Sequence, residues 1–245
     1  MKKTEIHISK SMDEMAAFLA NIIQVQVDKA APNYVSIALS GGSTPKVLLK
    51  WLSDKGPSNI QWEKVRLFWG DERCVGPDHP ESNYKMTREN LLDNIQLPYS
   101  NIFRIRGEAD PFDEAKRYSE LVYSQIPHEN QIPRFDLVFL GLGEDGHTAS
   151  IFPPDIGLFE SSNLFVDAKN PYSGQKRITA TGKLINNAKM VVFMVAGKSK
   201  AEMVARVIEK QQGYDKLPAS LVKPSNGELL WLLDEQAASS IKLQS

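Results

Sequence analysis

Short apolar runs alternate with amphipathic segments along most of the chain, and this alternation constrains the fold more than any other feature. Runs typical of buried strands occupy residues 34–40, 64–70, 101–106, 135–143, 189–197 and 228–234. Apolar residues at helical spacing occupy residues 11–30, 44–54, 82–95, 111–126 and 198–212. Strands that alternate with helices favour right-handed crossover connections. We therefore predict an α/β protein with a mostly parallel central sheet that is covered by helices on both faces.

Composition sets the size of the core and limits the classes of partner. The chain has 245 residues, of which 42% are hydrophobic, and it shows no repeat or obvious linker. This is enough for one large α/β domain or two small ones, and we predict a single domain over residues 1–245. The formal net charge is −1, which gives no support for a nucleic-acid partner or an anionic membrane. A small anionic substrate needs only a local positive pocket.

Cysteine content and hydropathy exclude further classes. Cys74 is the single cysteine, so a disulfide within the chain and a cysteine-based zinc site are excluded. No apolar run reaches the length needed for a membrane span or for the core of a signal peptide. We therefore expect a cytoplasmic protein without a membrane partner, either a monomer or a weak homodimer.

Polar or glycine-rich loops follow four of the predicted strands. Their sequences are SGGSTP, GDERC, GEDGHT and GKSK, and each begins where an apolar run ends. In open parallel sheets, ligands bind outside the carboxyl ends of the strands. We therefore expect these loops to meet at one binding site.

The first of these loops suits a phosphate group. Gly41 and Gly42 would let the backbone come close to a ligand. The free amides at the start of the next helix, together with the hydroxyls of Ser43 and Thr44, would bind the phosphate oxygens.

Two other interpretations of this loop stay open. It could be a tight turn in which Thr44 is the N-cap and Pro45 is the first helical residue. Ser40 could also be a hydrolase nucleophile at a strand-to-helix turn, although the leading glycine of that motif is absent.

The second loop places Asp71 and Arg73 directly after a strand. A carboxylate and a guanidinium there could position a polar substrate, and the guanidinium fork fits a carboxylate or a phosphate. The alternative is a solvated loop that contains a local ion pair.

His147 is the strongest candidate for a catalytic group. It follows Glu144 and Asp145 in a glycine-rich loop, and these acids could orient an imidazole or stabilise its charged form. An imidazole ordinarily titrates near neutral pH, which suits a general base. The alternative is a structural histidine that caps the following helix or bonds to its own loop. Asp71, Asp145 and His147 could together hold one metal ion, but the chain has no His-Glu-x-x-His pair and we expect no metal.

Basic residues at two further positions favour an anionic ligand. Arg177 lies on an expected strand within residues 174–182. Lys198 and Lys200 lie at the start of a predicted helix, where cations are unfavourable unless an anion is bound. The alternative is that both lysines point into water.

Four segments, taken in order, resemble the 6-phosphogluconolactonase family: SGGSTP, WGDER with DHPESNY, LGLGEDGHTASIFP, and RIT. This family belongs with the glucosamine-6-phosphate deaminases in one sugar-phosphate superfamily, and the resemblance covers roughly residues 10–235. Thr148, Ser150 and the following Phe-Pro pair favour the lactonase branch, as does Arg73, where the deaminases would carry tyrosine. The family often has prolines just before RIT, and this chain reads PYSGQK there.

The resemblance implies a three-layer α/β/α Rossmann-like fold. It also implies hydrolysis of 6-phospho-glucono-1,5-lactone to 6-phosphogluconate, the second step of the oxidative pentose phosphate pathway, without a cofactor or a required metal. The residues that match site positions of the family are His147 as the catalytic histidine, Asp71 and Arg73 in the second loop, Ser43 and Thr44 near the sugar phosphate, and Arg177 and Lys200 along the pocket. A glucosamine-6-phosphate deaminase/isomerase and a non-catalytic sugar-phosphate sensor are the alternatives.

Overall fold

A parallel β-sheet runs through the middle of the protein. The computed structural model describes residues 4–30, 33–57 and 60–242, and the two ends of the predicted domain, 1–3 and 243–245, lie outside the described residues. Within the described residues this sheet has seven strands, in the order β1 (Thr4–Ser9), β12 (Glu228–Asp234), β11 (Met190–Val195), β8 (Leu137–Leu140), β2 (Val35–Leu39), β3 (Val65–Trp69) and β5 (Ile102–Phe103). Every neighbouring pair in the sheet is parallel. The predicted α/β class with a mostly parallel sheet is therefore confirmed.

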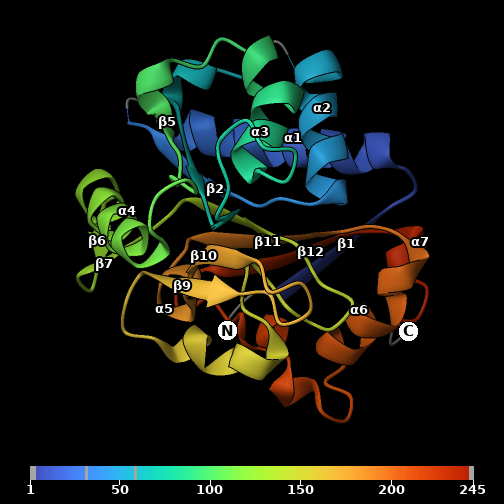
Figure 1. Ribbon diagram of the computed structural model, residues 1–245. Coiled ribbons are helices and arrows are strands. Elements are labelled where there is room, and N and C mark those ends of the chain that lie inside the picture. Colours follow the sequence, from blue (N-terminus) through green and yellow to red (C-terminus); the bar gives the residue numbers. More distant parts are fainter. Residues whose placement is uncertain (1–3, 31–32, 58–59, 243–245) are drawn as a thin grey trace.

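Helices cover both faces of this sheet, which gives three layers (Figure 1). The helices are α1 (Met12–Ala30), α2 (Ser43–Lys55), α3 (Asn83–Asn90), α4 (Pro111–Gln125), α5 (Gly182–Ile185), α6 (Ala201–Ile208) and α7 (Glu235–Ala238). Figure 1 shows α1, α2 and α3 on one side of the sheet, and α5 and α6 on the other. None of the helices in the described part of the chain has the length and apolar character of a bilayer span.

Two smaller antiparallel sheets accompany the central one. One has the order β4 (Asp71–Arg73), β10 (Lys176–Ala180) and β9 (Phe165–Lys169), and the other is the hairpin of β6 (His128–Glu129) and β7 (Ile132–Pro133). The first of them matters for the site, because β4 follows β3 after a single glycine, Gly70. It therefore joins the end of a central strand to a hairpin from much later in the chain.

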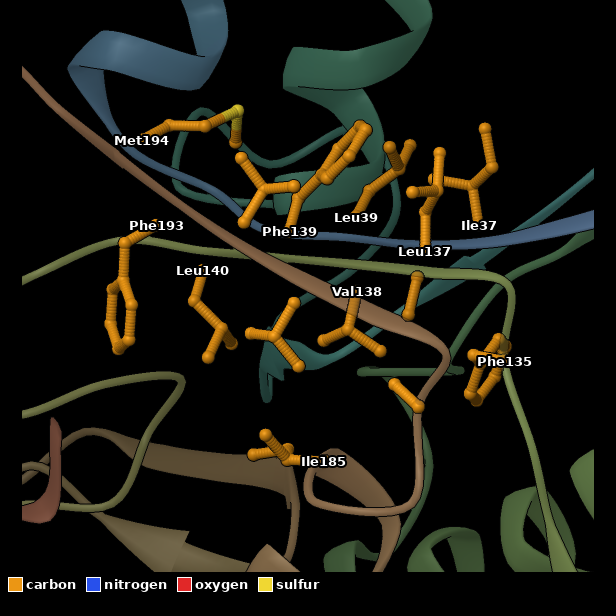
Figure 2. Packing of buried hydrophobic residues seen from close by; sticks show 14 of the residues in the cluster. Ile37, Leu39, Phe135, Leu137, Val138, Phe139, Leu140, Ile185, Phe193 and Met194 are labelled. Carbon is orange, nitrogen blue, oxygen red and sulfur yellow. The ribbon is translucent and has the colours of Figure 1, made fainter. Parts of the chain in front are cut away.

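The central strands are apolar on both sides because both sides are packed against helices. Figure 2 shows Leu137 and Phe139 of β8 pointing to one side of the sheet, whereas Val138 and Leu140 point to the other side, toward Ile185. All five side chains are almost fully buried. A fully buried aliphatic or aromatic side chain contributes about 1.5–3 kcal/mol, so this continuous apolar pattern fixes the middle of the sheet.

The direction of strand addition reverses between β2 and β8. From β2 the chain adds β3 and β5 on one side, and it then returns to place β8 on the other side of β2. The register pairs Ile37 with Leu137 and Ala38 with Val138. Such a reversal opens a crevice at the carboxyl ends of the two strands, and this is where the first and third predicted loops emerge.

Several elements differ from the sequence-based expectation, among them an edge strand and the start of a helix. Strand β1 was not predicted; it is a short edge strand in which polar and apolar residues alternate and only Ser9 is buried. The helix expected from residue 198 begins at Ala201, because Lys198–Lys200 form a separate 3₁₀ turn. In both cases the local apolar periodicity is weak, so strand pairing and packing determine which element forms and where it begins.

Tyr118 joins α4 to the ends of two central strands. Its side chain is fully buried, and its hydroxyl accepts a hydrogen bond from the amide of Trp69 at 3.0 Å and donates one to the carbonyl of Phe103 at 2.7 Å. Burial raises the pKa of this hydroxyl, so it keeps its proton. The hydroxyl therefore pairs the last amide of β3 just before the chain enters the site.

We expect Tyr118→Phe to lower the free energy of unfolding by about 1–3 kcal/mol, because the buried amide of Trp69 loses its partner. Urea unfolding followed by tryptophan fluorescence measures this difference. Tyr123→Phe, on the same helix and 48% exposed, is the matched control and should change stability by less than about 0.5 kcal/mol. Equal stability of the two variants would show that the buried hydroxyl is not needed.

Candidate active site

A cavity of about 180 Å³ lies where β2, β3, β8 and β11 end. The predicted site residues that line it are Gly41, Gly42, Ser43, Thr44, Asp71, Arg73, His147, Arg177 and Lys200. Asp145 does not line the cavity. The loops after four neighbouring strands of one sheet thus meet at a single site, as parallel topology requires.

The glycine-rich loop forms one wall of the cavity. Helix α2 begins at Ser43 after Gly42, and no side chain caps its first turn, so the interpretation of Thr44 as N-cap was wrong. Ser43 and Thr44 are instead the first helical residues, and both line the cavity. A helix start without a side-chain cap leaves amide groups available to a ligand.

Asn83 packs against this loop and was not singled out by the sequence analysis. Its amide nitrogen donates to the backbone carbonyl of Asp71 at 3.0 Å, and the residue is 2% exposed at the cavity wall. A β-carbon on Gly41 would come within 1.8 Å of the Asn83 Oδ1 atom, so only glycine fits there. The segment that contains Asn83 belongs to the family resemblance, and this was the available signal.

Asp71 is buried in a small polar cluster at the cavity edge. Its Oδ2 atom accepts a hydrogen bond from the hydroxyl of Ser150 at 2.6 Å and lies 4.0 Å from Nη1 of Arg177. Antiparallel pairing of β10 with β4 places Thr179 opposite Asp71 and Arg177 opposite Arg73. Burial lowers the pKa of Arg177, and the charge of Asp71 opposes this change.

Glu72 stabilises the loop that follows β3 by hydrogen bonds to its backbone and to the start of α3. Its carboxylate accepts hydrogen bonds from the backbone amides of Arg73, Asn83 and Tyr84 and from the hydroxyl of Ser82. Burial raises the pKa of Glu72, and the three amide donors partly oppose that rise. This network fixes the loop on either side of Asp71 and Arg73, so Glu72 is a structural group and not a ligand-facing one.

Lys200 and Arg73 each contact an acidic residue beside the cavity. Nζ of Lys200 lies 3.8 Å from Oε1 of Glu144, and Nη1 of Arg73 donates to the carbonyl of Glu81. The Nε atoms of Arg73 and Arg177 are buried and have no hydrogen-bond partner among the described residues. The cavity therefore has three cationic side chains along its wall, a charge pattern that favours an anionic ligand.

His147 and Asp145 form a hydrogen-bonded pair. Oδ1 of Asp145 lies 2.6 Å from Nδ1 of His147 and also accepts the backbone amide of His147 at 3.1 Å. A carboxylate can only accept, so Nδ1 carries the proton and Nε2 is left as the basic nitrogen. Burial opposes ionisation of Asp145, but these hydrogen bonds outweigh it and lower the pKa of Asp145 to about 2.

The imidazole ring packs between Phe152 and Gly143 at the cavity wall. The centroids of the His147 and Phe152 rings are 4.5 Å apart. The ring lies so close to Gly143 that a β-carbon at that position would be 2.0 Å from Nδ1 of His147. The segment that follows is not an α-helix: Thr148 and Ile151 form an isolated β-bridge. His147 therefore caps no α-helix.

Tyr172 reaches the same pair and was not predicted. Its hydroxyl donates to Oδ2 of Asp145 at 2.9 Å, from the loop between β9 and β10. The sequence carries no signal for this contact, because the two residues are far apart in the chain and Tyr172 lies in a polar loop.

The structure also bears on two alternatives, Ser40 as a nucleophile and a metal site at Asp71, Asp145 and His147. The Ser40 hydroxyl lines the cavity, and its hydrogen bond goes to the carbonyl of Gly41 at 3.4 Å, not to His147. Asp71 and the Asp145–His147 pair do not converge on one point. Within residues 4–30, 33–57 and 60–242, no group of three or more histidine, cysteine or acidic side chains could hold a metal ion.

Known proteins similar to this chain identify its family. The family model for glucosamine-6-phosphate isomerases/6-phosphogluconolactonase matches residues 10–231. A 6-phosphogluconolactonase of Haemophilus influenzae is 44% identical over 225 residues, which covers 87% of this chain and 94% of that protein. The crystal structure of the devB protein is similar with a TM-score of 0.91 and 39% identity, over 98% of this chain and 100% of that one.

A more distant structure extends the comparison. The 6-phosphogluconolactonase of Trypanosoma brucei is 28% identical, with a TM-score of 0.83 over 99% of this chain and 100% of that one. These findings confirm the resemblance derived from the four loop segments. The chain belongs to the glucosamine-6-phosphate isomerase/6-phosphogluconolactonase family.

Proposed function

We propose that this chain hydrolyses 6-phospho-D-glucono-1,5-lactone to 6-phospho-D-gluconate, with His147 as the general base that activates water. The observation that carries the proposal is the His147–Asp145 pair at the wall of a cavity that Arg73, Arg177 and Lys200 also line. A base beside a cluster of cations fits a reaction on a carbonyl of a phosphorylated sugar. The 6-phosphogluconolactonases among the relatives support the same substrate class.

The first step is attack of water on the lactone carbonyl carbon. Nε2 of His147 takes one proton from the water as the new C–O bond forms. The imidazolium that results donates through Nδ1 to Asp145, whose negative charge stabilises it. The hydrogen bond also keeps the ring in the tautomer that has a free Nε2 atom.

The second step is collapse of the tetrahedral intermediate. The bond from the carbonyl carbon to the ring oxygen breaks, and the imidazolium returns its proton to the departing oxygen, which becomes the 5-hydroxyl. Negative charge on the former carbonyl oxygen is stabilised by a guanidinium or by loop amides in the cavity. No covalent enzyme intermediate is needed, and Ser40 takes no part as a nucleophile.

The phosphate group supplies binding energy and orientation. We assign it to the cationic side chains together with the amides and hydroxyls of Ser43 and Thr44 at the start of α2. The position of Arg73, Arg177 and Lys200 along the cavity supports an anion here. The carboxylate of Asp71 faces the guanidinium of Arg177 and helps to fix its position. A cytoplasmic location and a monomeric or weakly dimeric state stay predictions from the sequence.

We expect His147→Gln to lower kcat for lactone hydrolysis by about 10²- to 10⁴-fold, the usual contribution of a general base. The measurement is acid release from freshly prepared lactone, corrected for spontaneous hydrolysis. His128→Gln is the matched control, because His128 lies on β6 and outside the cavity. Near wild-type turnover of His147→Gln would contradict the assignment. Release of ammonia from glucosamine 6-phosphate by the wild type would identify the isomerase–deaminase activity of the family instead.

We expect Asp145 to make the stability of the protein depend on pH below about pH 4. In the folded protein this carboxyl keeps its charge down to about pH 2, whereas in the unfolded chain it protonates near its ordinary pKa of about 4. Its contribution is therefore complete above about pH 4 and is lost as the pH falls through about 2. The difference in free energy of unfolding between wild type and Asp145→Asn should shrink over this range in urea titrations. A difference that is constant with pH would contradict the pairing with His147.

A further inference from the structure

The loop that joins β9 to β10, residues 170–175, has a closed conformation next to the site. The amide of Asn170 donates to the carbonyl of Gln175 at 2.9 Å, and the amide of Gly174 donates to the carbonyl of Asn170 at 2.9 Å. The side-chain oxygen of Asn170 accepts the amides of Tyr172 and Ser173 at 2.9 and 3.1 Å. Together these bonds define the path of loop 170–175.

This loop contacts both halves of the site. Tyr172 donates to Asp145 on the side of the general base. Gln175 donates through Nε2 to Oε2 of Glu81 at 3.0 Å, and the carbonyl of Glu81 accepts from Arg73 on the cationic side. The position of the loop is therefore coupled to the acid–base pair and to one cation.

We propose that Tyr172 is a positioning residue for the general base: its hydroxyl holds the second oxygen of Asp145 and thereby fixes the carboxylate that orients His147. This inference rests on the proposed function, because it assigns a role within the same reaction. Tyr172 does not line the cavity, so it acts through Asp145.

The geometry explains why a second donor matters. Oδ1 of Asp145 takes both hydrogen bonds from His147, so these bonds oppose rotation of the carboxylate about the Cβ–Cγ bond through one oxygen only. Tyr172 donates to Oδ2 at 2.9 Å and restrains the same rotation through the other oxygen. Both carboxylate oxygens then have fixed partners, and the imidazole that depends on them has one orientation.

The position of the Tyr172 ring supports a specific role. The side chain is 72% exposed, yet its ring makes an edge contact with Phe152, at 6.3 Å between centroids and 82° between planes. Phe152 in turn contacts the ring of His147. The hydrogen bond to Asp145 raises the pKa of the Tyr172 hydroxyl, so the phenol stays a donor at neutral pH. Tyr172 therefore contacts the pair through its hydroxyl and, by way of Phe152, through its ring.

The test removes only the hydroxyl. We expect Tyr172→Phe to lower kcat for the lactone by about three- to tenfold, the effect of one hydrogen bond, with KM unchanged. In an Asp145→Ala background the same substitution should have no further effect, because its target is gone. Tyr99→Phe, 79% exposed and outside the cavity, is the matched control and should leave kcat and KM at wild-type values.

A second readout does not need activity. The proton on Nδ1 of His147 gives an NMR signal that is assigned by its loss in His147→Gln. We expect Tyr172→Phe to shift or broaden this signal, while Tyr99→Phe leaves it unchanged. An unchanged signal, or equal effects of Tyr172→Phe with and without Asp145, would overturn the inference. If the wild type does not hydrolyse the lactone, the proposed function fails, and the NMR comparison still decides the role of Tyr172 toward the pair.

Discussion

Parallel pairing of β2 with β8 is the constraint on which the site depends. These strands are adjacent in the sheet, although β3, β5 and α4 separate them in the chain. Because parallel strands end at the same edge, the pairing brings the loop after Leu39 next to the loop after Leu140. The first supplies the start of α2 and the second supplies His147. The buried apolar side chains of β8, packed on both faces of the sheet, hold this arrangement (Figure 2).

The small antiparallel sheet is a second constraint, and it completes the site. Strand β4 leaves the end of β3 and pairs with β10, which carries Arg177 into the cavity beside Asp71. The hairpin that enters β10 also carries Tyr172 to Asp145. The segment from β9 to β10 therefore contributes two groups: Arg177 to the cavity, and the hydroxyl of Tyr172 to the His147–Asp145 pair. A movement of this hairpin would alter both halves of the site together.

Charge is distributed so that the base and the cations keep separate partners. Asp145 serves His147, Asp71 faces Arg177, and Glu144 faces Lys200. Asp71 is buried and takes the Ser150 hydroxyl on the oxygen that faces the guanidinium. A buried charge needs such partners, since desolvation is costly unless it is hydrogen-bonded. Three cationic side chains, those of Arg73, Arg177 and Lys200, nevertheless line the cavity, which favours an anionic ligand.

The sequence by itself determined the sheet class, the order of most strands and helices, and the strand-end loops. These follow from local patterns: period-two or continuous apolar runs for strands, helical spacing for helices, and glycine or polar clusters where strands end. The sequence also singled out His147 and Asp145, because they are two residues apart in one glycine-rich loop. Long-range contacts were beyond it: edge strand β1, the pairing of β4 with β10, and Asn83 against Gly41.

Only the tertiary structure decided how these groups act on one another. The hydrogen bond from Ser150 to Asp71 spans 79 residues of sequence, and the one from Tyr172 to Asp145 spans 27. The structure also showed that α2 begins at Ser43, so Thr44 has no capping role. The physical reason is that hydrogen bonds and burial depend on which segments meet in space. The periodicity of apolar residues predicts which face of a segment is buried, but not which other segment packs against that face.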